Sequence, residues 1–271
     1  MSITYQLNQN IAQFGGHELV LAGRIVYWPS QGAMILSNLL AEPPAPQFDL
    51  EGAANSRHRL SRGGRASAIE HDEHWAITLG LLQDRLSRFE PTTVYCLEDN
   101  NQWKGGGDSA LANKLKDARY WLRQYVRRHN WIWLTDDTHE DIGSLLGGQQ
   151  AMEARAGGLV LRAKASLTET RPEISGYFQP TAKLQNGHLT LRHRCYVESD
   201  NRLILPAFGS ASHGADVFAD QLAALVGPNF TAHLLSEPDI FTTPSSVLAA
   251  QGQAQKMPAN SDRPQKPSLA V

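Results

Sequence analysis

The sequence has few cysteines, no long apolar run and little net charge. Its 271 residues include two cysteines, Cys96 and Cys195, which is too few for a disulfide framework. No apolar run approaches the roughly 20 residues of a transmembrane helix, and residues 1–10 lack the basic-then-apolar layout of a signal peptide. We therefore expect a cytoplasmic protein that does not insert into a membrane.

The charge balance excludes a protein that is basic overall. The formal net charge is -2, and 41% of the residues are hydrophobic, a composition typical of globular domains. Proteins that coat nucleic acid through a global positive field carry a large excess of lysine and arginine. Any attraction to nucleic acid must therefore come from local clusters of basic residues.

The first half of the chain alternates strand-like and helix-like segments. Apolar runs predict two short strands within 17–28 and further strands at 33–38, 92–99 and 131–137. A capping box, Ser67 to Glu70, predicts the start of one amphipathic helix, and Leu111 to Tyr125 form the apolar stripe of a second. This order predicts an α/β layer whose strands end at a common edge.

The second half is richer in short strands. Segments 158–163, 174–178, 189–197 and 202–208 predict a second, largely antiparallel sheet that packs against the first. From residue 249 the composition shifts to Gln, Ala, Pro, Lys and Ser, which predicts a disordered tail. We therefore expect one domain over residues 1–248 and a tail over 249–271.

Three segments carry a resemblance to a known family. They are "HELVLAGRIVYWPSQGAMILSNLL" (17–40), "VYCLED" (94–99) and "LTLRHRCYVESDNRLILPAFGSASHG" (189–214). The chain resembles the calcineurin-like metallophosphoesterases, and within them the bacterial ligase-associated phosphodiesterases of the DNA damage response. The resemblance implies an α+β fold, a two-sheet β-sandwich flanked by helices, which agrees with the element pattern.

The resemblance also implies where a two-metal centre would lie, and most of its ligands are replaced. Family members bind two divalent ions through Asp, His and Asn side chains at the strand ends, and the ions activate a water for phosphodiester hydrolysis. The matching positions here hold residues that bind metals poorly or not at all: Asn38, Gln102, Lys164, Tyr177 and Gln179. Candidate remnants of the ligand set are Asp99, Asp136 and Asp137. We therefore expect no catalytic residue and no metal cofactor.

A basic segment follows the third predicted strand. Arg57, Arg59, Arg62 and Arg65 lie in "RHRLSRGGR", where glycine-flanked guanidinium groups suit bidentate contacts to phosphate. The alternative is a solvated loop with no ligand. In the family this loop borders the site, so the four arginines are candidate phosphate-binding residues.

These observations predict a catalytically degenerate, ligase-associated metallophosphoesterase with a binding role in DNA repair. Its expected partners are a repair ligase or helicase, or the phosphates of nucleic acid. The alternative is an active phosphodiesterase or nuclease that uses Asp99, Asp136 and Asp137 with Mn or Mg. A third interpretation is an interaction protein that binds through its Pro-rich linker (41–46) and tail (252–271). Lys164 is expected to supply, at the degenerate centre, the positive charge of a missing metal.

Overall fold

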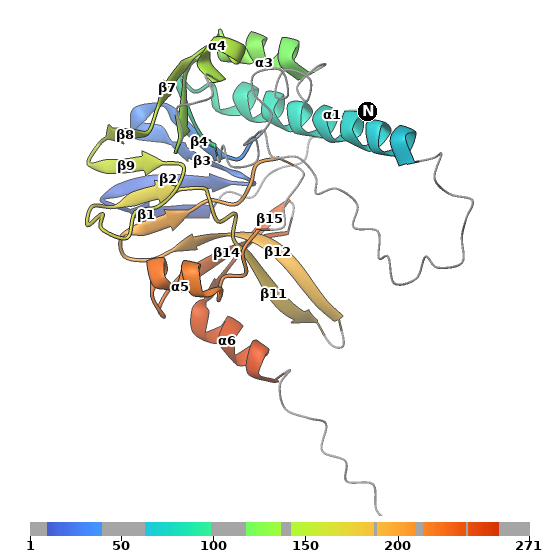
Figure 1. Cartoon of the computed structure of the whole chain (residues 1–271). Coiled ribbons are helices and arrows are strands. Elements are labelled where there is room, and N and C mark those ends of the chain that lie inside the picture. Colours follow the sequence, from blue (N-terminus) through green and yellow to red (C-terminus); the bar gives the residue numbers. More distant parts are fainter. Residues whose placement is uncertain are drawn as a thin grey trace, which may run out of the picture.

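The computed structural model describes residues 10–39, 63–98, 118–136, 142–186, 189–209, 214–236 and 238–254. They form two facing β-sheets with helices on both outer sides (Figure 1). The expected two-sheet sandwich flanked by helices is therefore confirmed. None of the described helices is long and apolar enough to cross a membrane.

The first sheet, sheet A, has seven strands that pair in chain order. Its first four strands are antiparallel neighbours, and the pairs from the fourth strand to the seventh are parallel. The strands are β1 (Asn10–Phe14), β2 (His17–Ala22), β3 (Ile25–Trp28), β4 (Ala33–Ser37), β5 (Thr93–Glu98), β6 (Asn130–Thr135) and β7 (Gln149–Ala151).

The second sheet, sheet B, is largely antiparallel, as predicted, and it contains two parallel pairs. Its members are β8 (Glu153–Ala156), β9 (Leu159–Arg162), β10 (Glu173–Ser175), β11 (Thr181–Asn186), β12 (Leu189–Glu198), β13 (Arg202–Ile204), β14 (Thr231–Ser236) and β15 (Asp239–Pro244). The two parallel pairs are those that β10 makes with β9 and β13. The parallel pairs matter because their ends meet the ends of the parallel strands of sheet A.

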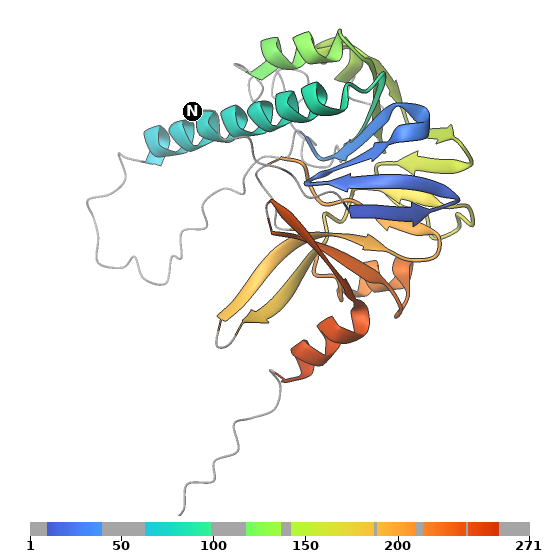
Figure 2. The ribbon, with the colours of Figure 1, turned by 180° about the vertical axis from the view of Figure 1, so that it is seen from behind.

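Helices cover the outer face of each sheet, and three cores separate the layers. α1 (Gly63–Phe89), α3 (Ala118–Val126) and α4 (Ile142–Leu146) pack on sheet A, whereas α5 (Asp220–Val226) and α6 (Ser245–Ala254) pack on sheet B (Figures 1 and 2). A short 3-10 helix, η1 (Pro29–Gln31), precedes β4. The middle core joins the two sheets through residues such as Trp28, Ile35 and Tyr196.

The strands β4, β5 and β6 are apolar on both faces. In β4, Met34 and Leu36 point into the core under α1 and α3, whereas Ala33 and Ile35 point into the core between the sheets. A strand that is buried on both faces needs a continuous apolar run rather than an alternating one. This explains why these three strands could be predicted from the sequence.

Two boundaries differ from the prediction. α1 begins at Gly63, ahead of Ser67, so the proposed capping box lies inside the helix, and Arg65 is helical rather than part of a loop. α6 continues to Ala254, through the first residues assigned to the disordered tail, and residues 255–271 lie outside the described part.

Candidate functional site

The parallel strands of the two sheets end beside one another. The backbone N–H of Phe208, beyond β13, donates to Ser37 O of β4 at 2.7 Å, and Ser37 Oγ donates to Pro206 O at 2.8 Å. Leu205 N donates to Ser175 O at the end of β10. These bonds join the ends of β4, β10 and β13. We call Asn38, Lys164, Gly176, Tyr177 and Gln179, which lie around this junction, the strand-end site.

Asn38 follows β4 and is fixed by its surroundings. Its side chain is 1% exposed, and its φ of 50° lies in the left-handed region, where asparagine is found more often than most residues. Its backbone N–H donates to Leu97 O at 2.8 Å, and Nδ2 donates to Gly176 O at 2.7 Å. The amide of Asn38 therefore holds the two sheets together at the position where the resemblance places an aspartate ligand.

Residues 176–179 form a turn rather than the end of a strand. The predicted strand 174–178 stops at Ser175, because both Gly176 N and Tyr177 N donate to Ala163 O, at 3.0 and 2.9 Å. Gln179 N then donates to Gly176 O at 3.2 Å, and Gln179 has a φ of 48°. The turn brings Tyr177 beside the segment that follows β9.

Lys164 lies over the ring of Tyr177. Its Nζ is 4.7 Å from the ring centroid, and its side chain is exposed to solvent. An ammonium at this distance from a ring face makes a cation–π contact. The structure thus brings together two of the predicted positions, and they present a positive charge on an aromatic ring.

The segment that carries Lys164 is anchored by ion pairs. Glu173 is fully buried between Arg162, whose Nε lies 2.8 Å from Oε1, and Arg202, whose Nε lies 3.1 Å from Oε2. Burial raises the pKa of Glu173, although both guanidinium groups oppose the rise. Hydrogen bonds from Arg171 lower the pKa of Glu169 to about 2. These charges fix the loop between β9 and β10.

Asp136 occupies a bend directly after β6. One of its carboxylate oxygens, Oδ1, is shielded from solvent and accepts no hydrogen bond from the residues that the structure describes. Asp99, Gln102 and Asp137 lie outside the described residues, as do Arg57, Arg59 and Arg62. The backbone of Arg65 lies in α1, and its side chain is not among those described.

The described residues of the strand-end site do not fit a two-metal centre. The amide nitrogen of Asn38 is a donor already used by Gly176 O, and an ammonium over a ring repels a dication. Divalent ions of this class need converging carboxylates and imidazoles. Within the described parts of the chain, no three His, Cys, Asp or Glu side chains gather as such a set would require.

Arg24 contributes to this junction and was not predicted. Its Nη1 donates to Phe208 O at 3.0 Å and lies 3.4 Å from Gly209 O. Arg24 lies in the turn between β2 and β3, far from Phe208 in the sequence, and nothing in the local pattern marks it. The contact fixes the Pro-Ala-Phe-Gly segment against sheet A.

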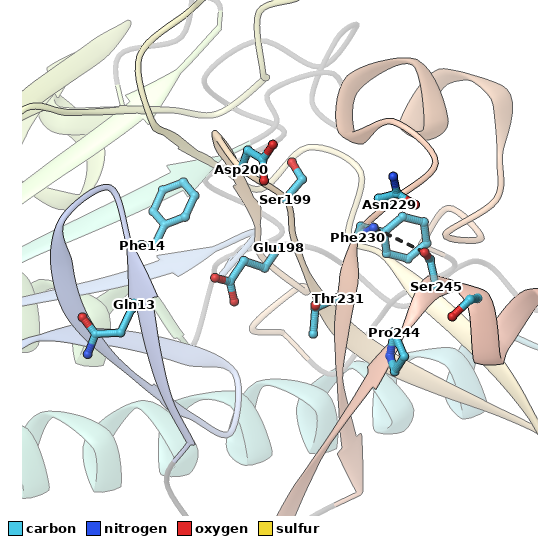
Figure 3. Close-up of a pocket in the computed structure, with 11 residues that line it drawn as sticks. Gln13, Phe14, Glu198, Ser199, Asp200, Asn229, Phe230, Thr231, Pro244 and Ser245 are labelled. Carbon is cyan, nitrogen blue, oxygen red and sulfur yellow. Dashed lines mark hydrogen bonds between the residues drawn. The ribbon is translucent and has the colours of Figure 1, made fainter.

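A separate cavity has a volume of about 570 Å³, and Figure 3 shows the residues that line it. It lies beside the hairpin between β12 and β13, where β14 starts and β15 ends, and its lining includes Phe14, Glu198, Asp200, Phe230 and Ser245. Glu198 Oε2 is 2.8 Å from His233 Nε2, and Ser245 Oγ donates to Pro228 O. None of the predicted site residues lines this cavity.

Comparison with known proteins gives a structural match. The fold is similar to the crystal structure of the nuclease MPE from Pseudomonas putida, with a TM-score of 0.61 and 16% sequence identity over 87% of this chain and 100% of the other. No protein-family model matches the sequence, and no curated protein matches it either. At this identity the likeness shows that the chain has the fold of that nuclease.

Proposed function

We propose that this chain binds phosphate groups of nucleic acid at the strand-end site and does not hydrolyse them through a two-metal centre. The similar fold of a nuclease supports nucleic acid as the ligand class. The observation that carries the proposal is the bond from Asn38 Nδ2 to Gly176 O at 2.7 Å. Through this bond, the side chain at the position of the first metal ligand in the family that the sequence resembles serves to hold the structure together.

Charge at the site supports binding rather than cleavage. The exposed ammonium of Lys164 lies at the same junction as Asn38, and a fixed cation attracts a phosphate without activating water. Arg57, Arg59, Arg62 and Arg65 belong to the proposal as further phosphate contacts. A role beside a DNA-repair ligase or helicase follows from the family resemblance and is part of the same proposal.

A second candidate function is a metal-dependent phosphodiesterase with a reduced site. Oδ1 of Asp136 favours it, because this oxygen is shielded and has no hydrogen-bond donor among the described residues, and a cation would supply a partner. This site would combine Asp136 with Asp99 and Asp137, and Mg or Mn suits its carboxylate oxygens.

Metal analysis together with a cleavage assay separates the two functions. The protein is incubated with excess Mn and Mg, desalted, and measured for bound metal and for cleavage of single-stranded DNA and plasmid. We expect no stoichiometric metal, no metal-dependent cleavage, and salt-sensitive DNA binding that Lys164→Ala weakens. Two metals per chain and cleavage would overturn the proposal. One metal, with cleavage that Asp136→Ala abolishes, would establish the second function.

A further inference from the structure

Helix α3 and the turn that follows it carry positive charge only. The sequence from Ala118 to Asn130 contains Arg119, Arg123, Arg127 and Arg128 and no aspartate or glutamate. Figure 1 shows α3 at the outside of the helical layer, beside α4 and above α1, and it packs on both of them. A local concentration of arginine of this kind contrasts with the net charge of -2 for the whole chain.

Two large aromatic side chains lie exposed on the same helix. Tyr120 is 63% exposed and Trp121 is 54% exposed. Their ring centroids are 5.3 Å apart at an interplanar angle of 79°, an edge-to-face arrangement. Large aromatic groups that gather at the surface mark binding sites more often than isolated ones do. The pair leaves aromatic surface open to solvent beside the arginines.

The helical repeat places Arg127 on the same face of the helical path as Tyr120. Ala118, Leu122 and Val126 form the buried stripe of α3. The backbone N–H of Arg127 donates to Arg123 O at 3.1 Å, so the helical path continues to Arg127. Residues seven apart share a face about 10.5 Å apart along the axis, which pairs Tyr120 with Arg127. Arg128 follows in the turn, where its backbone N–H donates to Tyr125 O at 3.1 Å.

The arginines of this segment differ in what they already bind. Arg123 Nε donates to Leu145 O at 2.8 Å, which fixes α3 to α4. Arg119 Nε is shielded from solvent and has no hydrogen-bond acceptor in the described structure. Arg127 and Arg128 are exposed. The last two are therefore the side chains best placed to meet a ligand from solution.

We propose that Tyr120, Trp121, Arg127 and Arg128 form a surface, the α3 surface, that binds single-stranded nucleic acid. Unpaired bases stack on the two rings, and backbone phosphates contact the two guanidinium groups. A duplex does not fit this role, because its base faces are covered by neighbouring base pairs. This inference rests on the proposed function because both take nucleic acid as the ligand, but the α3 surface uses other residues than the strand-end site.

Topology connects the α3 surface to the strand-end site. β5 and β6 are parallel, and α3 lies between them in the chain, so the helix runs against the direction of both strands. Its first turn, with Tyr120 and Trp121, therefore lies toward the edge at which β5 and β6 end. Asn38 lies at this same edge, at the end of β4. A strand held on α3 can thus extend toward the strand-end site.

Binding of a fluorescent 20-nucleotide DNA strand, measured by anisotropy with the full chain, tests the α3 surface. Trp121→Ala weakens binding about tenfold, whereas Trp121→Phe, which keeps a stacking ring, stays within about threefold of wild type. Phe241→Ala is the matched control, because Phe241 is also 54% exposed but lies on β15. It leaves binding unchanged.

A strand of abasic sugar-phosphate units separates stacking from charge. Wild type binds it about tenfold more weakly than the base-bearing strand, and Trp121→Ala loses most of this preference. Arg127→Gln with Arg128→Gln lowers the salt slope of binding by about 0.7 per contact. Arg155→Gln, at an exposed position on β8, leaves the slope as it is. An RNA strand of the same sequence shows which nucleic acid is preferred.

Two results would overturn the α3 surface. One is equal binding of the base-bearing and abasic strands by wild type, and the other is a Trp121→Ala variant that binds as wild type does. Either can occur while Lys164→Ala still weakens binding, which leaves the proposed function standing. Conversely, metal-dependent cleavage would contradict the proposed function, and the effect of Trp121→Ala would still decide the role of α3.

Discussion

Gly176 lies against the side chain of Ser37, at the point where the two sheets meet. A Cβ added to Gly176 would be 2.2 Å from Ser37 Cβ and 2.8 Å from Ser37 Oγ. Ser37 and Gly176 are both held in place, since Ser37 Oγ donates to Pro206 O and Gly176 N donates to Ala163 O. The absence of a side chain at residue 176 is therefore what allows the ends of β4 and β10 to approach.

Gly176→Ala should lower the free energy of unfolding by about 1–3 kcal/mol, because neither sheet can move away without breaking these bonds. The matched control is Gly80→Ala in α1, where the added methyl meets nothing within 4 Å. It should raise the free energy of unfolding by about 1 kcal/mol, because alanine favours the helix. Urea denaturation of both variants is the measurement. A Gly176→Ala variant as stable as wild type would show that the sheets can separate here.

Asn38→Asp tests the role of the buried amide. Aspartate cannot donate to Gly176 O, so the variant places a negative charge against a carbonyl oxygen. This should lower the free energy of unfolding by at least about 1–3 kcal/mol. Because burial raises the pKa of such a carboxyl, the deficit should narrow as the pH falls toward about 4. Asn130→Asp, at an exposed position, should change little. Thermal denaturation with and without Mn is informative: recovery of stability by Mn would show that a carboxylate here restores a metal site.

Lys164→Met should lower the free energy of unfolding by about 0.5–1 kcal/mol through loss of the contact with Tyr177. Lys164→Arg should retain most of it, since a guanidinium also packs on ring faces. Lys183→Met, at a 57% exposed lysine of β11 that lies 3.5 Å from Asp216, serves as the control and should change less. Unchanged urea midpoints for Lys164→Met would show that the ammonium does not stabilise the site.

The lowered pKa of Glu169 predicts that the stability difference between wild type and Glu169→Gln changes with pH only in the acid range. Arg171 lowers the pKa of Glu169 from its ordinary value of 4.5 to about 2. A carboxyl with a lowered native pKa stabilises the fold above the unfolded value, and the contribution disappears as the pH falls through the native one. Glu169→Gln should therefore have a lower melting temperature than wild type above pH 4.5, and the two should converge between about pH 4.5 and 2. If the difference in melting temperature between the two proteins stayed constant over this pH range, the charge of Glu169 would be excluded as the cause of that difference.

The sequence predicted the parallel part of sheet A well, because β4, β5 and β6 are continuous apolar runs that are buried on both faces. The second sheet was predicted less well. Glu173 begins β10 although it is charged, since Arg162 and Arg202 lie against it from neighbouring strands, and no local pattern reveals such partners. The turn at Gly176 was missed for a similar reason, because Ser37, which requires the glycine, lies in the other sheet.

The sequence predicted which positions belong to the candidate site, but it did not predict which of these side chains contact one another. The family resemblance named Asn38, Lys164 and Tyr177 one by one, and the structure shows that Lys164 and Tyr177 are in contact. Tyr120 and Trp121 were not predicted as site residues; they lie on α3, and Arg127 and Arg128 follow this helix in the chain. The exposure of the two rings depends on which face of α3 the core covers.

The burial of β4 on both faces, with a paired strand along each edge, has a consequence for hydrogen exchange. Amide hydrogens of Met34, Ile35 and Leu36 can exchange with solvent only when both cores and both neighbouring strands open, so they should be among the slowest in the molecule. Asn38 follows directly after this strand. The side chain of Asn38 therefore keeps its position at the strand-end site even while more weakly held parts of the fold open to solvent.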